Sequence, residues 1–498
     1  MGQARRRGSF EQRQAELWTQ YGVKPLTPER YNAYVAWTRT PIASFLGEEL
    51  EFFSSSDEVL VGVILLDTTD RDFAFVTLGR DEKGRFRAID CSASLTRTEA
   101  RHLLFASIKR HGDSRSAVFP QGDADDKAGV DLFQATAPRD KLHPSFKLLN
   151  EGDHWIPAKS IMSEMMRHFR DVDGNFVEQF QTTGFDSRIW ELYLYAALLE
   201  LGLFVEKPNP APDFCVKSGR KQVFIEAVTV NPSAGEPKVE PSKEGLMRSP
   251  EEILELLKGK APIKFGSALY SKLNRKKPYW ELDDVKGKPL VFAIADFHES
   301  QSMTWTSPAL LQYLYGVSHD FVRDEAGQLV ISPIKLEAFE FEGKKIPAGF
   351  FLLPGSENVS AILFSSSGTL SKFNRMGRLA GFGLANQHIF RWGLHHKHDL
   401  NSALPEPFLH DVRQGITTET WAEGLSMFHN PQARHPVDHR IFPSIAHHRY
   451  VDGQIESLLP DFHPYTSYTW NLLAVDDETF EKTRKEFESG INAQPVDT

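Results

Sequence analysis

The segment from 186 to 201, DSRIWELYLYAALLEL, constrains the fold most strongly because it is apolar on nearly every side of a helix. Such a helix must be covered all around, so it belongs inside a core rather than on a surface. Gly202 ends the pattern, and three short strand-like runs follow at 203–205, 213–216 and 223–230. The last two are separated by Lys-Ser-Gly-Arg, a typical tight turn. These features predict a buried helix that packs on a sheet containing a hairpin.

The chain then returns to helix and strand. Ser249-Pro250, with Glu252 three residues after the serine, predicts the start of a short helix that ends near Lys258. A longer basic helix is predicted from about Ile263 to Lys276, and an apolar strand follows at 290–295. The resulting order of α, β, β, β, α, β predicts an α/β (α+β) fold with a mixed sheet.

The rest of the chain divides around this core. We predict five parts: an N-terminal antiparallel α+β domain (1–118), a linker (119–157), the core (158–300), a C-terminal α+β region (301–490) and a disordered tail (491–498). In the first domain, helices are predicted at 10–21, 27–38 and 96–109, and strands at 60–66, 73–78 and 85–89. Elsewhere, helices are predicted at 158–170 and 308–315, and strands at 350–353 and 359–364.

Composition indicates a globular chain, since 41% of the residues are hydrophobic and 25% are charged. The most apolar run of the chain, 189–205, carries Glu191 and Glu200 and is shorter than the roughly 20 residues that a membrane helix requires. The N-terminus lacks the apolar stretch of a signal peptide, and the two cysteines, Cys91 and Cys215, are too few for a disulfide framework. We therefore expect a cytoplasmic protein with no membrane partner.

Charge is distributed unevenly. The net charge is -10, yet residues 258–288 contain nine Lys or Arg against three acids. Phosphate neutralisation dominates affinity for nucleic acid, so a nucleic-acid partner would have to bind this local patch. A solvated helix face followed by a turn is the alternative interpretation.

Three carboxylates lie on the predicted core. Glu191 is on the buried helix, Asp213 begins a strand after Pro212, and Glu226 lies in the next strand. Pairing of the two strands would set Asp213 beside Glu226, where like charges repel unless a cation bridges them. Oxygen ligands of this kind suit Mg²⁺. Ordinary roles also remain open: Glu191 could pair with Arg188, and Asp213 could be a turn residue.

These pieces resemble the PD-(D/E)XK nuclease superfamily, which has the restriction-endonuclease-like fold. RIWELYLYAAL matches the helical Glu of the family, PDF the first half of its motif and IEAV the second half, over about 110 residues from 186 to 296. The resemblance implies an αβββαβ core and a Mg²⁺- or Mn²⁺-dependent endonuclease that hydrolyses phosphodiester bonds, with DNA as the preferred nucleic acid. Asp213, Glu226 and the Ala227 carbonyl would hold the metal, and Glu191 would bind a second metal or position water.

One position departs from the family motif. Val228 stands where the family usually has Lys, two residues after the second acid. Some members supply this Lys from the neighbouring helix, which here offers Lys272 among apolar residues of a core-facing stripe, and Lys264 as a second candidate. Snorkelling of Lys272 toward solvent is the alternative.

The remaining expectations concern binding and alternatives. Lys272, Arg275, Lys276 and Lys277 are predicted to hold the phosphate backbone. If Val228 marks lost activity, the chain is instead a catalytically inactive nucleic-acid-binding or assembly module. A weaker alternative is a metallohydrolase built on the C-terminal histidines 395, 396, 398, 429, 435, 439, 447 and 448, which lack the spacing of a zinc motif.

Overall fold

The computed structural model describes residues 10–114, 116, 118–123, 129–208, 211–233, 249–473 and 476–492. The chain forms two compact units. The first comprises Met1–Gln134, Ser160–Asp171 and Leu379–Phe382, and the second comprises Ala135–Lys159, Val172–Arg378 and Gly383–Thr498. Both contain helices and sheets, which confirms the mixed α+β class. None of the described helices is both long and apolar enough to cross a membrane.

The first unit is an antiparallel sheet in the order β1-β2-β3-β4-β5 with helices on both faces. Its elements are α1 (Phe10–Tyr21), β1 (Val23–Pro25), α2 (Pro28–Val35), α3 (Ala43–Leu46), β2 (Gly47–Ser55), β3 (Leu60–Asp67), β4 (Phe73–Arg80), β5 (Phe86–Leu95) and α4 (Arg97–Asp113). Leu104 and Phe105 of α4 join one core, and Tyr31 and Tyr34 of α2 join the other. Apolar side chains that alternate along the strands fill both cores.

The second unit is built on a mixed sheet in the order β19-β18-β17-β14-β9-β8-β7-β6. These strands are β6 (Phe204–Glu206), β7 (Phe214–Ser218), β8 (Lys221–Val230), β9 (Leu290–Asp296), β14 (Ala361–Ser365), β17 (Leu425–His429), β18 (Ala446–Val451) and β19 (Gln454–Leu458). The other strands are β10 (Val317–Arg323), β11 (Leu329–Lys335), β12 (Ala338–Phe341), β13 (Lys344–Pro347), β15 (Gln387–His395), β16 (Glu406–Asp411) and β20 (Tyr468–Leu473).

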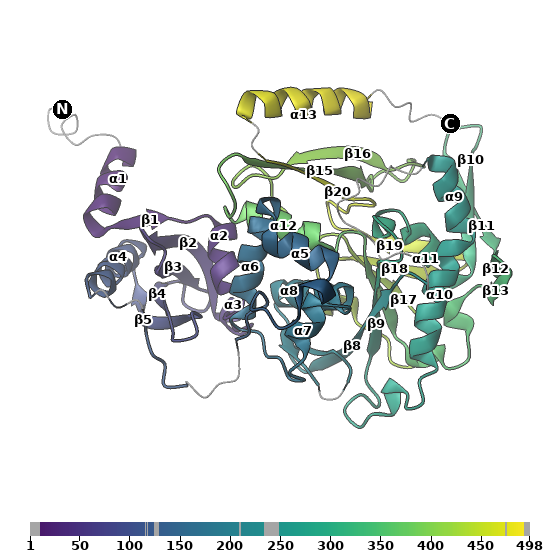
Figure 1. Ribbon diagram of the computed structural model, residues 1–498, viewed down its shortest axis with the longest axis horizontal. Coiled ribbons are helices and arrows are strands. Elements are labelled where there is room, and N and C mark those ends of the chain that lie inside the picture. Colours follow the sequence, from purple (N-terminus) through teal and green to yellow (C-terminus); the bar gives the residue numbers. More distant parts are fainter. Residues whose placement is uncertain are drawn as a thin grey trace. The chain divides into compact units, whose positions relative to one another are not determined.

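Helices cover both faces of this sheet. The helices of the second unit are α5 (Pro144–Glu151), α6 (Ile156–Met166, which continues into the first unit), α7 (Phe176–Gln181), α8 (Phe185–Glu200), α9 (Pro250–Lys258), α10 (Lys260–Leu273), α11 (Ser307–Tyr315), α12 (Leu370–Leu379) and α13 (Asp477–Asn492). Tyr193 of α8 contacts Ser365, and Phe265 of α10 contacts Phe364. Successive strand residues point to opposite faces, so α8 and α10 lie on opposite sides of the sheet, as Figure 1 shows.

The predicted core elements are present in the expected order. Helix α8, strands β6, β7 and β8, helices α9 and α10, and strand β9 follow one another along the chain. Strands β7 and β8 are antiparallel neighbours, whereas β8 and β9 are parallel, so the four strands form one mixed sheet. The basic helix ends at Leu273 rather than at Lys276, because Asn274 caps it and Pro278 follows shortly after.

The structure groups the chain differently from the predicted domains. Strands β14, β17, β18 and β19 extend the sheet of the core, so no boundary falls near residue 300. The expected linker contains α5, whose Phe146 and Leu149 are buried. The expected tail overlaps α13, which reaches Asn492, and 493–498 lie outside the described residues.

One predicted strand is wrong. Residues 350–353 form a 3₁₀ turn, since Gly349 adopts a φ of 87° and reverses the chain just before it. The amides of Leu352 and Leu353 then donate to the carbonyls of Gly349 and Phe350, so local hydrogen bonds replace those of a strand ladder. The apolar pattern alone could not distinguish these two outcomes.

The close approach of α12 to Pro157 gives a first prediction. A Cβ added at Gly377 would lie 2.1 Å from the Pro157 carbonyl oxygen, which is backbone and cannot rotate away. Gly377→Ala should therefore lower the free energy of unfolding by about 1–3 kcal/mol, the usual cost of overpacking. Ser371→Ala, on the same helix, is the control and should leave the melting temperature nearly unchanged. Equal melting temperatures for both variants would contradict this packing.

Candidate functional site

The pairing of β7 with β8 brings two of the predicted carboxylates together. Phe214 pairs with Ile225, so Asp213 lies directly opposite Glu226. Asp213 Oδ2 accepts a hydrogen bond of 2.8 Å from the backbone nitrogen of Ala227. Glu226 is only 7% exposed, although it is an acid within an apolar strand. The hairpin thus places both carboxylates and the Ala227 backbone at one point on the β7 and β8 pair.

Glu226 is held by groups from the α10 side of the sheet. Lys272 Nζ donates a hydrogen bond of 2.7 Å to Glu226 Oε1, and the Tyr279 hydroxyl donates one of 2.5 Å to the same oxygen. The Arg275 guanidinium lies over the Tyr279 ring, 4.1 Å from its centroid. The Lys272 amine, a candidate from the sequence, therefore contacts Glu226 directly. Burial and the neighbouring Glu226 charge raise the pKa of Tyr279, which keeps its hydroxyl a donor.

Glu191 is held by two cations. Arg188 Nη1 lies 2.6 Å from Glu191 Oε1, and Lys207 Nζ lies 3.7 Å from Oε2. Burial raises the pKa of Glu191, while these two cations oppose the rise. The structure thus contains the Glu191–Arg188 ion pair, which the sequence left open as an alternative to a functional role for Glu191. Burial in turn lowers the pKa of Lys207, which is attracted to Glu191 and Asp213.

Asp213 is the least compensated of the three acids. Burial, followed by the charges of Glu226 and Glu191, raises the pKa of Asp213 to about 7, although the Ala227 hydrogen bond and the Lys272 charge oppose the rise. Three carboxylates thus interact electrostatically at this point, and an additional positive charge beside Asp213 would relieve the repulsion. This is the environment expected of a cation site, and ionic networks without function can also produce it.

The other basic candidates occupy different positions. Lys264 Nζ donates to Ser233 Oγ at 2.6 Å, so it does not share the Lys272 contact with Glu226. Lys276 and Lys277 are exposed and follow the end of α10. Val228 is buried, 3% exposed, on the same strand face as Glu226. Of the four residues predicted to bind the phosphate backbone, Lys272 contacts Glu226 directly and Arg275 reaches the site through Tyr279. Lys264 instead lines a neighbouring groove.

This groove has a cavity volume of about 440 Å³ and borders the end of β8. Three lysines line it: Lys260 and Lys264 from α10, and Lys344 from β13. Lys344 Nζ donates to Ser267 Oγ at 2.7 Å, while Lys260 pairs with Glu299 at 3.3 Å. We call these three residues the lysine groove. Lys260 and Lys264 are one helical turn apart, and Lys272 lies about two turns further along α10, rotated by about 80° from Lys264.

A preformed cluster of metal-ligand atoms occurs at one place among the described residues. Asp67, Asp70 and Asp72 place three such atoms within 4.8 Å of one another. They lie on the turn between β3 and β4, where Asp67 accepts from the Thr69 amide and Asp70 from the Asp72 amide, as turn aspartates commonly do. Among the described residues, no such group of three ligand atoms is formed by Glu191, Asp213 and Glu226, or by the C-terminal histidines.

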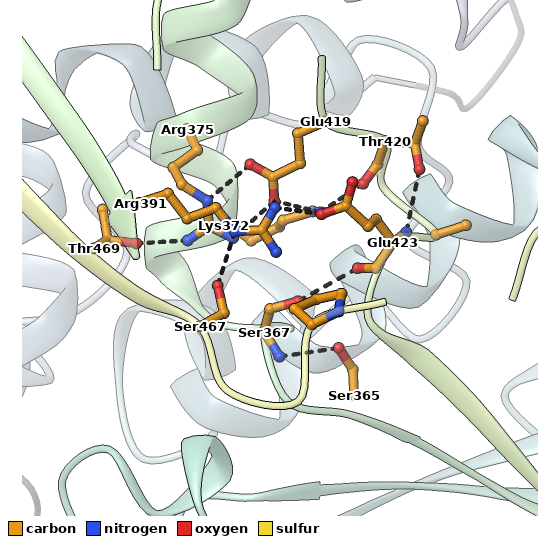
Figure 2. Close-up of polar contacts among 12 residues, drawn as sticks. Ser365, Ser367, Lys372, Arg375, Arg391, Glu419, Thr420, Glu423, Ser467 and Thr469 are labelled. Atoms are coloured by element: carbon orange, nitrogen blue, oxygen red, sulfur yellow. Dashed lines mark hydrogen bonds and ion pairs between the residues drawn. The ribbon is translucent and has the colours of Figure 1, made fainter. Parts of the chain in front are cut away.

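A second charged cluster lies fully inside the second unit, where Figure 2 shows Lys372 and Arg375 of α12 and Arg391 of β15 around Glu419. Arg391 also contacts Glu423. Burial opposes ionisation of Glu419, but the three cations hold the pKa of its carboxyl well below the usual range. All four charged groups are essentially inaccessible to solvent. The cluster therefore connects α12 to β15 and the 419–423 loop, which is a structural role.

Two residues at the carboxylate site are not indicated by the sequence patterns. Lys207 directly follows β6, and the register of β6 with β7 places Glu206 opposite Cys215, so Lys207 falls beside the start of β7. Recognising β6 as a partner of β7 could have predicted this position. Tyr279 follows α10 in a loop with no periodic pattern, and no sequence signal linked it to Glu226.

Comparison of the chain with protein-family models, curated proteins and solved structures gives no match. The case for a function therefore depends on the residues of the site.

The raised pKa of Asp213 predicts how stability depends on pH without metal. The folded-state pKa of about 7 lies above the ordinary value of 3.8, so the folded state binds the proton more tightly than the unfolded state. Stability conferred by this group is present below about pH 4 and is lost as the pH rises through about 7. Melting temperatures in EDTA should therefore fall between about pH 4 and 7 more steeply for the native protein than for Asp213→Asn.

Asp411→Asn is a suitable control, because burial also raises the pKa of Asp411 but that residue lies far along the chain from the carboxylates, on β16. The change in melting temperature caused by Asp411→Asn should be the same with and without Mg²⁺. At about pH 8, Mg²⁺ should raise the melting temperature of the native protein but not that of Asp213→Asn. Parallel curves for the native protein and Asp213→Asn would contradict the crowding of charge at Asp213.

Proposed function

We propose that the chain is a Mg²⁺-dependent nuclease that hydrolyses phosphodiester bonds in nucleic acid, with DNA as the preferred substrate. The observation that carries the proposal is the contact of Lys272 with Glu226, 2.7 Å long, beside Asp213. An amine and two acids on these elements are the combination that the PD-(D/E)XK resemblance requires. The order of α8, β6 to β8, α10 and β9 supports the restriction-endonuclease-like core within the same proposal.

The residues fit a hard divalent cation. Asp213, Glu226 and the Ala227 carbonyl supply oxygen ligands, and both hydrogen bonds of Glu226 fall on Oε1, so Oε2 is the oxygen that a metal would use. The excess negative charge reflected in the raised pKa of Asp213 favours such an ion. When bound, Mg²⁺ or Mn²⁺ would polarise a phosphoryl oxygen and lower the pKa of a coordinated water.

The protein groups have separate roles in this proposal. Lys272 orients the attacking water or stabilises negative charge that develops on the phosphate, as a preorganised donor does. Tyr279 fixes the orientation of Glu226 through its 2.5 Å hydrogen bond, and so acts as a positioning residue. Glu191 contributes a further negative charge, held in place by Arg188 and Lys207, and would position water or a second metal.

The positive charges on and beside α10 support a polyanionic substrate. Arg275, Lys276 and Lys277 follow the Lys272 site at one end of the helix, and the lysine groove lies toward its other end. The chain as a whole carries a charge of -10, so phosphates would be attracted only locally. This arrangement would position the backbone of a nucleic acid along α10 and past the carboxylates.

A catalytically inactive nucleic-acid-binding or assembly module is the second candidate. The observation that favours it is that each acid already has a partner within the protein: Glu191 pairs with Arg188, Asp213 with the Ala227 amide, and Glu226 with Lys272. Such pairing can stabilise a nuclease fold that has lost its chemistry. Activity measurements separate the two candidates.

Removal of the Lys272 amine tests the proposed function directly. Lys272→Ala should reduce the rate of Mg²⁺-dependent cleavage of plasmid or single-stranded substrates by about 10²-fold or more, typical of losing one preorganised charged donor. Mg²⁺ affinity measured by calorimetry should persist. Asp213→Asn and Glu226→Gln should instead lose both cleavage and Mg²⁺ binding, because each removes a carboxylate ligand.

Lys264→Ala is the matched control for the chemical step, since its amine contacts Ser233 rather than Glu226. At saturating substrate its single-turnover cleavage rate should stay near that of the native protein, although its affinity for nucleic acid should fall. The double variant Val228→Lys with Lys272→Ala asks whether an amine at the usual strand position restores cleavage. Full activity in Lys272→Ala would exclude the proposed catalytic role, and absence of cleavage by the native protein with Mg²⁺ and Mn²⁺ would favour the inactive module.

Salt dependence tests the lysine groove. Reversal of Lys260, Lys264 and Lys344 to Glu should weaken nucleic-acid binding and flatten the slope of log affinity against log salt by about one unit for each phosphate that the protein no longer neutralises. The matched comparison is reversal of Arg275, Lys276 and Lys277, which tests the other end of α10. Unchanged slopes in both triple variants, measured by fluorescence anisotropy, would place the binding surface elsewhere.

A further inference from the structure

A separate cavity of about 230 Å³ lies within the second unit, on the α11 face of the large sheet. It is lined by the start of α11, by β10, by strands β14, β17 and β18, and by residues 463–465. The carboxylates and the lysine groove contribute no residue to it. Four histidines line it: His319, His396, His448 and His463. The sequence patterns indicated neither His319 nor His463 as a candidate.

Two buried nitrogen atoms at this cavity lack protein partners. His463 is 4% exposed, and its Nε2 is 3.1 Å from Ser426 Oγ. Within the described part of the chain, His463 Nδ1 and His319 Nε2 are buried and have no hydrogen-bond partner. A neutral imidazole offers one donor and one acceptor, and leaving a buried one unpaired is costly. Both residues line the cavity, so a ligand that turns either ring toward the cavity would satisfy its unpaired nitrogen.

The cavity walls carry no fixed charge. Among the described residues that line it there is no Lys, Arg, Asp or Glu. Burial holds the pKa of His463 well below its ordinary value and lowers the pKa of His448 to about 3, so these imidazoles are neutral at physiological pH. A phosphate, carboxylate or ammonium group would enter without a counter-charge, which is unfavourable in a buried site. The walls therefore favour an uncharged polar ligand.

Aromatic rings also line the cavity. The Phe428 and His448 rings are stacked, with centroids 4.8 Å apart and planes 18° from parallel. Tyr465 contacts the edge of His396 at a centroid distance of 5.4 Å. Flat rings pack well against such surfaces. The volume is below the range of about 300–1,000 Å³ found for drug-sized ligands, so a single or fused ring system is the appropriate size.

We propose that this cavity binds an uncharged planar heterocycle of the nucleobase type, whose edge pairs with His463 and His319 while its face packs against the aromatic wall. Purines and pyrimidines combine these properties, since their rings are flat and neutral and their edges carry both donors and acceptors. The proposal does not rest on the nuclease activity, because it requires neither the carboxylates nor a metal.

Isothermal titration of the full-length protein in EDTA with adenine, cytosine and their nucleosides tests this proposal. At least one of these probes should bind saturably to a single site, and His463→Ala should weaken its affinity by about 10-fold or more, as loss of a buried hydrogen-bond partner does. The control is His435→Ala, which alters an exposed histidine that does not line the cavity. The affinity of His435→Ala for the base should equal that of the native protein. Asp213→Asn should also bind normally, which separates this result from the nuclease proposal.

A second variant guards against a folding defect in His463→Ala. Leu311 lines the cavity from α11 and is only partly buried, so Leu311→Trp can fill the space without removing a buried hydrogen bond. It should abolish binding of the base and keep the native melting temperature. Binding that survives Leu311→Trp would overturn the proposal. So would a lack of binding by every base and nucleoside at millimolar concentration, or His463-dependent binding of Zn²⁺ or inorganic phosphate in the absence of base binding.

Discussion

The antiparallel register of β7 and β8 is the constraint on which the candidate site depends. Asp213 stands opposite Glu226 only because Phe214 pairs with Ile225, and a shift of one residue would turn Glu226 to the opposite face. Parallel pairing with β9 fixes the other edge of β8 and places it between two buried neighbours. Glu226 is therefore held inside an apolar sheet, where its charge must be compensated, and Lys272 and Tyr279 provide that compensation.

Hydrophobic periodicity and turn residues in the sequence were sufficient to predict the helices and strands that carry the candidate site. The apolar helix, the tight turn between β7 and β8 and the basic helix gave the mixed sheet, the pairing of Asp213 with Glu226 and the position of Lys272 on a core-facing stripe. Each inference uses a fixed periodicity, either two residues in a strand or 3.6 in a helix.

The rest of the structure required contacts between distant segments, which a single sequence does not specify. Tyr279 reaches Glu226 from an irregular loop, and Lys207 reaches Glu191 through the pairing of β6 with β7. Strands β14, β17 and β18 join the same sheet although long stretches of chain separate them from β9, so the boundary expected near residue 300 is not observed. Similarly, nothing in the patterns around Lys372, Arg375 and Arg391 indicated that they meet at Glu419.

The two charged clusters of the second unit differ in a way that bears on function. At Glu419, three cations surround one fully buried acid, the pKa of which stays low, and the network is closed to solvent. At Asp213 the balance is reversed, because the nearby Glu226 and Glu191 add to the effect of burial and raise its pKa. Lys272 at this second cluster retains 33% side-chain exposure, so solvent and solutes can approach it. Partial access and incomplete compensation are expected of a site that receives a ligand, whereas complete compensation without access is expected of a structural network. The contrast supports a functional role for the carboxylates and a structural one for the buried network.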